Sequence, residues 1–375
     1  MKRKLASIRK VKELREIKGA DLIELAIIDG WQCVVKKGEF KKGDMGVYFE
    51  IDSYLPLDEK YEFLRKSCYK KMGEKEGLRI KTIKLRKKIS QGLFLPLSIF
   101  ENLSNEVKIV EGNDLTELLN IQKYDPPIPA CLSGAIAGNF PSFIKKTQQE
   151  RIQNLWDEYN KELLNDGSKN IIKNMFFEPS IKLDGTSMTC FAVDPKLFPT
   201  KSFEKTQQEN KELNNEYYLG VCGRNFELQE KEGNTYWKVF NADIKDKLLK
   251  YHLKTKRNIA LQGEMIGEGI QKNRENIKGQ KFFCFEIWDI DKQRYLVKSE
   301  RLKILEEMNI QSIPTLDNIQ PFIIFKTIDD ILLFAEGESL NSNNREGLVF
   351  KSIELINGET ISFKVISNKF LLKNE

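Results

Sequence analysis

Residues 178–193 read EPSIKLDGTSMTCFAV. Their pattern predicts a strand that ends at Lys182, a turn at Asp184-Gly185, and a second strand that starts at Thr186. A lysine at a strand end can point into a cleft, and the bare backbone of a glycine lets a phosphate approach closely. Such a lysine becomes a nucleophile when burial, a nearby cation or a metal frees its amine. Taken alone, Lys-x-Asp-Gly is a weak signal that is more typical of a solvated lysine before an ordinary turn.

The composition is that of an ordinary globular protein. The chain has 375 residues, 40% hydrophobic and 31% charged, which favours two domains. No apolar run approaches the ~20 residues that span a bilayer, and the N-terminal MKRKLASIRK lacks the apolar segment of a secretory signal. We therefore expect an intracellular protein, cytoplasmic or nuclear, that does not contact a membrane and is a monomer.

The scarcity of histidine excludes several kinds of catalysis. The chain has a single histidine, His252, in a basic amphipathic segment where a solvated or half-packed side chain is expected. Catalytic triads and His-ligated zinc sites require at least one well-placed imidazole. The six cysteines form no CxxC pair, so we expect reduced core thiols. The chemistry must come from Lys, Arg, Asp and Glu, with or without a carboxylate-bound metal.

The first hundred residues form a basic module of short strands. They hold 24 Lys and Arg against 14 Asp and Glu, whereas the remaining residues hold 37 against 41. Turn signals such as Asp29-Gly30 separate the strands at hairpin spacing. We expect a small closed β-barrel of the OB type, a common nucleic-acid platform, although abundant lysine could also be compositional bias. The densest basic run supplies the candidate duplex-binding residues, which are Lys81, Lys84, Arg86, Lys87 and Lys88; a solvated strand edge is the alternative.

Proline and glycine mark the domain boundary. The stretch YDPPIPACLSGAIAGNFP at 124–141 predicts a linker. We assign 1–122 to the OB domain, 123–139 to the linker and 140–375 to the second domain. Apolar spacing predicts an amphipathic helix over 143–164 and further helices at 298–309 and 327–335. A hairpin over 78–97 is expected to turn near Ser90–Gly92, and the polar segment 200–216 is expected to be an excursion between strands.

Five further elements follow Lys182 in a fixed order. They are CGRN at 222–225, GEMIG at 263–267, FFCFEI at 282–287, REGLVFK at 345–351 and SFKVI at 362–366. Together with KLDG at 182–185, they resemble motifs I, Ia, III, IIIa, IV and V of the covalent nucleotidyltransferase superfamily of ATP-dependent ligases and mRNA capping enzymes. The resemblance implies an α+β chain, in which the OB barrel precedes a mixed α/β nucleotidyltransferase domain, ATP-grasp-like, of antiparallel sheets and helices.

The resemblance also implies roles for individual residues. Lys182 would be adenylylated by ATP, and Lys364 would contact the α-phosphate. Glu346 would bind Mg²⁺ or Mn²⁺ through water, and Glu264 would meet the ribose or a second metal. The remaining nucleotide and end contacts would come from Asp184, Gly185, Arg224, Asn225, Arg151 and the adenine-stacking Phe282.

Domain order indicates the branch of the superfamily. Only eleven residues follow Lys364, whereas capping enzymes and most DNA ligases carry an OB domain there. The N-terminal OB module is similar to that of the RNA ligase 5 group. That resemblance implies an ATP-dependent RNA ligase that seals 3′-OH/5′-phosphate nicks in duplex RNA or RNA/DNA hybrids. An mRNA guanylyltransferase, a DNA ligase or a non-catalytic RNA-binding scaffold are the alternatives, the last because Ser362 replaces a lysine usual in motif V.

Overall fold

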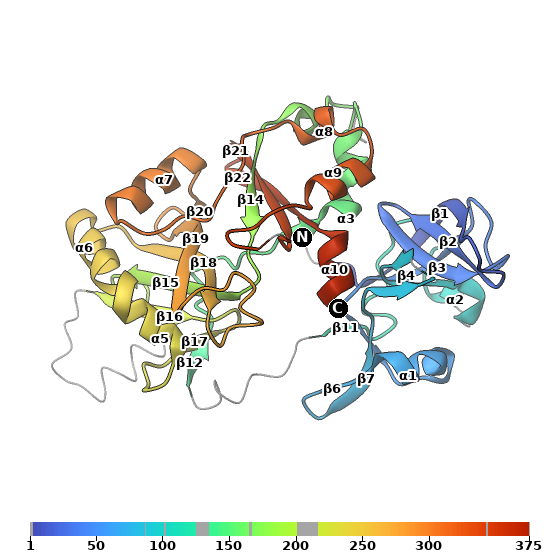
Figure 1. Ribbon diagram of the computed structural model, residues 1–375, viewed down its shortest axis with the longest axis horizontal. Coiled ribbons are helices and arrows are strands. Elements are labelled where there is room, and N and C mark those ends of the chain that lie inside the picture. Colours follow the sequence, from blue (N-terminus) through green and yellow to red (C-terminus); the bar gives the residue numbers. More distant parts are fainter. Residues whose placement is uncertain are drawn as a thin grey trace.

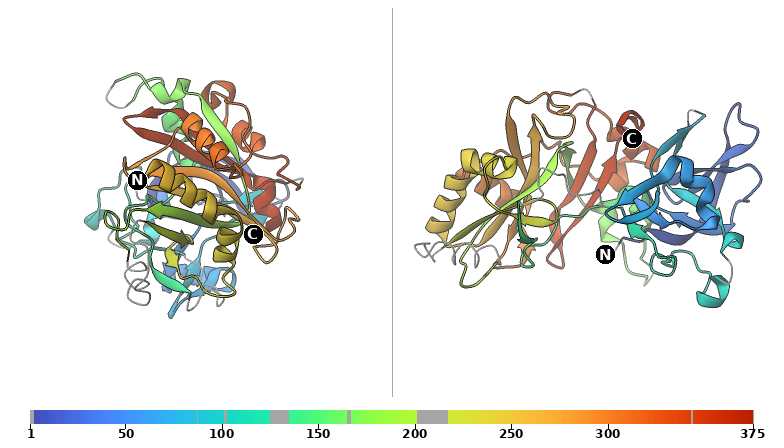
Figure 2. Two further views of the ribbon diagram at one scale, coloured as in Figure 1. Left: turned by 90° about the vertical axis from the view of Figure 1, so that its left-hand side faces the viewer. Right: turned by 90° about the horizontal axis from the view of Figure 1, so that it is seen from below.

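The computed structural model describes residues 3–86, 88–100, 103–124, 135–164, 167–200, 217–342 and 344–374. The OB module lies at one end and a helix-covered sheet at the other, with a second sheet between them (Figures 1 and 2). None of the described helices is long and apolar enough to cross a membrane.

The OB module is built on a five-stranded sheet that forms a half-barrel. Its order is β10-β4-β1-β2-β3, and every pairing is antiparallel. A bulge between Val11 and Glu13 bends β1, so that one long strand pairs with β4 along its first half and with β2 along its second. The strands are β1 (Ala6–Glu16), β2 (Ile23–Ile28), β3 (Trp31–Lys36), β4 (Met45–Phe49) and β10 (Leu93–Pro96).

Smaller elements extend the module. A four-stranded sheet, in the order β11-β5-β7-β6, carries short helices on its flank, and β8 pairs with β9 in a hairpin. Their bounds are β5 (Ser53–Pro56), α1 (Arg65–Cys68), β6 (Tyr69–Met72), β7 (Lys75–Arg79), β8 (Ile83–Leu85), β9 (Lys88–Ser90), α2 (Leu103–Glu106) and β11 (Gln122–Lys123).

The ligase domain contains two sheets. A seven-stranded antiparallel sheet has the order β12-β17-β16-β15-β18-β19-β20, and a four-stranded sheet has the order β13-β22-β21-β14. The strands are β12 (Ile136–Asn139), β13 (Glu150–Arg151), β14 (Phe177–Lys182), β15 (Thr186–Val193), β16 (Tyr218–Cys222), β17 (Phe226–Leu228), β18 (Ile259–Gly267), β19 (Gln280–Asp289), β20 (Arg294–Tyr295), β21 (Gly347–Ile356) and β22 (Glu359–Ile366).

Helices cover the sheets and create two main cores. One core joins α5, α6 and α7 to one face of the seven-stranded sheet, and a second joins α3, α8 and α9 to the four-stranded sheet. The helices are α3 (Ile152–Asn160), α5 (Thr235–Val239), α6 (Lys245–Thr255), α7 (Lys298–Glu307), α8 (Pro321–Ile324), α9 (Ile328–Phe334) and α10 (Asn368–Asn374).

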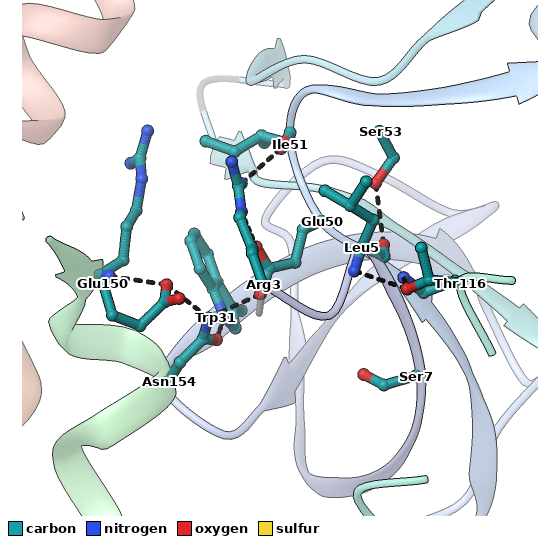
Figure 3. Close-up of polar contacts among 12 residues, drawn as sticks. Arg3, Leu5, Ser7, Trp31, Glu50, Ile51, Ser53, Thr116, Glu150 and Asn154 are labelled. Carbon is teal, nitrogen blue, oxygen red and sulfur yellow. Dashed lines mark hydrogen bonds and ion pairs between the residues drawn. The ribbon is translucent and has the colours of Figure 1, made fainter. Parts of the chain in front are cut away.

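The OB module docks on the start of α3 (Figure 3). Trp31 Nε1 donates to Asn154 Oδ1 at 2.5 Å, and Asn154 Nδ2 donates to Glu50 Oε1 at 2.6 Å. The amide of Gly30 donates to the Gln153 carbonyl at 3.2 Å. A Cβ at Gly30 would lie 2.7 Å from Gln153 Cα, so only glycine permits this close approach.

Three sequence-based boundaries are wrong. The helix predicted over 143–164 begins only at Ile152 and ends at Asn160, and just before it Glu150 and Arg151 form β13, which pairs in parallel with β22. The hairpin turn lies at Arg86, with a positive φ of 44°, rather than near 90–92. Part of the predicted linker belongs to sheets, because β11 pairs with β5 and β12 with β17.

The expectations for two helices and for the cysteines agree with the fold, whereas the expectation for His252 does not. The predicted helices at 298–309 and 327–335 correspond to α7 and α9. His252 is buried rather than solvated, and its Nδ1 lies 2.8 Å from the Arg257 carbonyl oxygen, which leaves it a packing role. The five cysteines within the described ranges are buried and free. Cys131 and most of the predicted 200–216 excursion lie outside the described residues.

Candidate active site

Lys182 lies where the chain crosses between the two sheets of the ligase domain. It is the last residue of β14, which pairs with β21, whereas β15 begins four residues later and pairs with β16 and β18. The crossover is anchored by Leu183, which is buried in the core. The lysine therefore projects into a cleft whose two walls are different sheets.

The crossover leaves no room for a side chain at position 185, which is occupied by Gly185. A Cβ there would lie 2.4 Å from the Met265 carbonyl oxygen and 2.5 Å from Ile266 Cγ2. The neighbouring Asp184 forms an ion pair with Arg274, whose guanidinium stacks on the Phe370 ring of α10. Gly185 and Asp184 thus fix the turn that aims Lys182, and neither lines the cavity described below.

Lys182 forms an ion pair with Glu346, which directly precedes β21. Its Nζ lies 2.7 Å from Glu346 Oε1. Burial alone would lower the pKa of Lys182, but the carboxylates of Glu346, Glu264 and Asp184 raise it above the ordinary value. The amine is protonated in the free protein, so a nucleophilic role requires this ion pair to be broken.

Glu264 occupies the opposite wall of the cleft. It lies on β18, where it is paired in register with Ser187 of β15. The pKa of Glu264 is raised to about 7, chiefly by burial and also by the Glu346 carboxylate, while the Lys182 ammonium acts in the opposite direction. The fold therefore brings together three motif residues that are up to 164 positions apart in the sequence. They are Lys182, Glu264 and Glu346, and their charges interact within one cleft.

Lys364 lies beside Arg151 on the four-stranded sheet. β13 and β22 run parallel and set Arg151 opposite Lys364, while Lys364 also pairs with Val349 of β21. Burial, together with the nearby charges of Arg151, Lys182 and Arg3, lowers the pKa of Lys364 to about 7. A buried group of cations is an environment that favours an anionic ligand.

These side chains surround a cavity of about 350 Å³. Lys182, Lys364, Glu264, Arg224 and Asn225 line it, with Arg224 and Asn225 supplied by the turn between β16 and β17. Arg151 and Glu346 adjoin the cavity through Lys364 and Lys182 without lining it.

The structure places Phe282 elsewhere, which corrects the sequence-based assignment. Phe282 is 2% exposed in the core beneath α5 and α6, where its ring packs over Gly263, and does not line the cavity. Phe285 of the same strand lines the cavity instead. The register of β18 and β19 shifts here, because Gln262 pairs with Glu286 and Gly263 with Cys284, which leaves Phe285 as a bulge on β19.

Other cavity residues escaped the sequence analysis. Lys123 lies on β11, so the OB module contributes to the wall of the cavity, and only docking of the two domains brings it there. Phe140 and Lys146 come from the stretch between β12 and β13 at the start of the ligase domain, which the sequence analysis did not assign to the site. Lys351 could have been found, because strand alternation places it on the same face as Gly347 and Val349.

A buried group of four charges lies behind Phe285. We call Glu178, Glu286, Arg301 and Lys351 the charge cluster; each is at most 4% exposed. Arg301 lies 2.7 Å from Glu178 and 3.7 Å from Glu286, and Lys351 lies 2.5 Å from Glu286. Lys351 Nζ also donates to the Phe285 carbonyl at 2.5 Å. The cluster is neutral overall, and it fixes the strand segment that presents Phe285.

The carboxylates fit a hydrated divalent cation. Among the described residues, no group of three or more His, Cys, Asp or Glu could enclose a metal ion. Glu264 and Glu346 are two hard oxygen donors near Lys182. Mg²⁺ and Mn²⁺ suit such a site because they bind oxygen and, as Mg²⁺ shows most clearly, retain several waters.

The basic run of the OB module lies on the β8–β9 hairpin. Lys84, Arg86 and Lys88 are exposed and Lys81 is half-buried, whereas Lys87 lies outside the described residues. Ile83 and Leu85, on the same hairpin, are 37% and 38% exposed. Exposed cations beside exposed apolar side chains suit a polyanion that also presents apolar faces.

Comparisons with known proteins agree with this architecture. Residues 5–97 match the family model of an OB-fold domain, and residues 178–366 match that of RNA ligase. A search of curated proteins gave no match. Together with the RNA ligase match, an OB module joined to a lysine-centred cleft identifies the chain as a polynucleotide ligase.

The solved structures show which ligases are similar. The structure of Naegleria gruberi RNA ligase with pyrophosphate is 41% identical, covers 100% of this chain and 99% of that one, and has a TM-score of 0.80. A mutant of that ligase with ATP and manganese is 41% identical over 98% of both chains, with a TM-score of 0.79. The chain belongs to the RNA ligase family of enzymes.

Proposed function

We propose that this enzyme uses ATP and a divalent metal to seal 3′-OH/5′-phosphate nicks in duplexes whose 3′-OH strand ends in RNA. The observation that carries the proposal is Lys182, held 2.7 Å from Glu346 beside a cavity that Lys364 lines and Arg151 adjoins. The solved relatives with ATP, manganese and pyrophosphate support the choice of cosubstrate and metal.

The first step transfers AMP to Lys182. After the ion pair with Glu346 breaks and the ammonium loses a proton, Nζ attacks the α-phosphorus of ATP. The new N–P bond forms as the bond to the bridging oxygen breaks, and pyrophosphate leaves with the electron pair. Lys364, and Arg151 beside it, neutralise charge that accumulates on the phosphates. Glu346 and Glu264 would hold the metal, which supplies further positive charge at the phosphates when bound.

The later steps use the nicked nucleic acid. The 5′-phosphate attacks the adenylylated lysine and releases Lys182, and the 3′-OH then attacks the activated 5′-phosphate and expels AMP. Arg224 and Asn225, on one turn at the cavity, are suited to the ribose and the 5′ end. Lys84, Arg86 and Lys88 are suited to the phosphates of the duplex.

Sealing of defined nicks tests the proposal. We expect a nick with an RNA 3′-OH strand to be sealed at least about tenfold faster than an all-DNA nick, a difference worth about 1.4 kcal/mol in transition-state binding. A Lys84→Ala/Arg86→Ala double variant should bind nicks more weakly and with a smaller dependence on salt, while its reaction with ATP alone is unchanged. Lys250→Ala, an exposed lysine on α6, is the matched control. Equal sealing of RNA and DNA ends would contradict the assigned substrate.

The two phenylalanines of β19 are expected to respond differently. Phe285→Leu should raise the KM for ATP about tenfold, because base–aromatic stacking is worth about 1–3 kcal/mol, with little change in the melting temperature. Phe282→Leu should lower the melting temperature and leave that KM nearly unchanged, since its ring packs in the core. The reverse pattern would return the stacking role to Phe282.

A further inference from the structure

Gln262 presents an unsatisfied hydrogen-bond acceptor to the cavity. The residue lies on β18, is 2% exposed and lines the cavity. Its Nε2 donates to the Lys145 carbonyl at 2.9 Å, whereas its Oε1 is buried and has no hydrogen-bond partner among the described residues. Turning the amide around would set its oxygen against the Lys145 carbonyl, so this contact fixes the orientation.

An unpaired buried acceptor is costly. Leaving such a group without a partner costs about 1–3 kcal/mol, and a ligand that donates a hydrogen bond to it recovers that energy. Lys351 also lines this wall, but its Nζ already donates to Glu286 and to the Phe285 carbonyl. Among the described residues that line the cavity, Gln262 is the one with a buried side-chain polar atom that has no hydrogen-bond partner.

The strand places Gln262 where a nucleotide base would lie. Glu264 is two residues along β18 on the same face, about 6.5 Å away by strand geometry, and it acts electrostatically on Lys182. A nucleotide with its α-phosphate at Lys182 and its ribose near Glu264 would extend its base towards Gln262. Phe285, on the neighbouring strand, lines the same cavity.

We propose that Gln262 determines the choice of base, with its Oε1 accepting a hydrogen bond from the exocyclic amino group of adenine. Adenine carries an amino donor at C6, whereas guanine carries a carbonyl acceptor there. An acceptor facing that edge binds the first base and repels the second. This inference rests on the proposed reaction of Lys182 with ATP.

The test compares nucleotides that differ at one group. We would measure kcat/KM for labelling of the full-length protein with ATP, with purine riboside triphosphate, which lacks the amino group, and with GTP. The wild type is expected to prefer ATP to the purine analogue by at least about tenfold, the value of one hydrogen bond of about 1.4 kcal/mol. GTP should be used least.

Gln262→Met removes the acceptor and keeps the length of the side chain. Its labelling with ATP should fall to the level of the purine analogue, whose own kcat/KM should hardly change. Gln280→Met on β19 is the control, because Gln280 donates to the Glu268 carbonyl and does not line the cavity. It should keep the wild-type preference.

Three outcomes would overturn the proposal. If the wild-type protein uses ATP and the purine analogue equally well, it does not recognise the amino group of adenine. This outcome can be observed without any variant. A Gln262→Met protein that loses activity equally with both nucleotides shows only that the residue shapes the cavity. A preference for GTP over ATP would show that the site selects guanine rather than adenine. Failure of the wild type to label with any nucleotide would instead overturn the proposed function.

Discussion

Lys182→Ala is expected to abolish the transfer of AMP to the protein. With α-labelled ATP and Mn²⁺, the wild-type chain should carry label on a denaturing gel, and the variant should carry none. Four other lysines line the cavity, and each comes from another part of the chain than Lys182: Lys364 from β22, Lys351 from β21, Lys123 from β11 and Lys146 from the stretch between β12 and β13. We expect none of them to replace the nucleophile. Lys364 approaches from β22, and Lys351 Nζ is engaged with Glu286 and the Phe285 carbonyl.

The control must separate loss of the nucleophile from loss of the fold. Lys281→Ala removes an exposed lysine from β19 and should label like the wild type. The Lys182→Ala protein should keep a melting temperature close to that of the wild type, because Lys182 is a partly exposed residue at a strand end. Labelling that persists in a folded Lys182→Ala protein would assign the nucleophile to another residue. Label from GTP alone would favour a guanylyltransferase.

Lys364→Ala is expected to slow the same transfer by about 10²–10³-fold. Removal of one preorganised charge contact to a transition state typically costs about 2.7–4 kcal/mol. Lys364 lines the cavity at the register position opposite Arg151, so alanine leaves Arg151 as the neighbouring cation. Single-turnover labelling at saturating ATP measures the effect, and an unchanged rate would exclude contact of Lys364 with the reacting phosphate.

The acidity of Lys364 gives this prediction a pH dependence. Its pKa is lowered to about 7 by burial and by neighbouring cations, so the free enzyme carries this charge below about pH 7 and loses it above. Arginine stays protonated throughout this range. The ratio of kcat/KM for Lys364→Arg to that of the wild type should therefore rise between about pH 6 and pH 9, because kcat/KM reports on the free enzyme. A constant ratio would show that Lys364 does not titrate there.

Motif residues were easier to predict than their surroundings. Lys182, Glu264 and Lys364 lie on strands whose sequences are distinctive, and strand pairing brings them together. The face on which Phe282 and Phe285 act could not be predicted, because the core that holds Phe282 covers one side of the sheet and the core that includes Phe283 covers the other. The alternation of side chains along a strand assigns residues to two opposite faces of the sheet, but it does not show which of these faces borders a cleft.

Non-local pairing explains the remaining errors. The helix predicted over 143–164 includes Glu150 and Arg151, yet these two residues pair with β22 more than two hundred residues later, and this contact overrides local preference. Lys123 reaches the cavity only because the OB module docks on the ligase domain. Neither contact leaves a signal in the local sequence.

The charge cluster constrains how this enzyme can change over evolutionary time. Two buried carboxylates and two buried cations offset one another, and the partly exposed Lys298 also pairs with Glu178. Loss of one member leaves a buried charge short of a partner, and breaking a buried ion pair costs about 3–5 kcal/mol. That penalty is a large share of the stability of a typical domain. Glu178, Glu286, Arg301 and Lys351 should accordingly be inherited as a set, and a lineage that replaces one of them should carry compensating substitutions at the others.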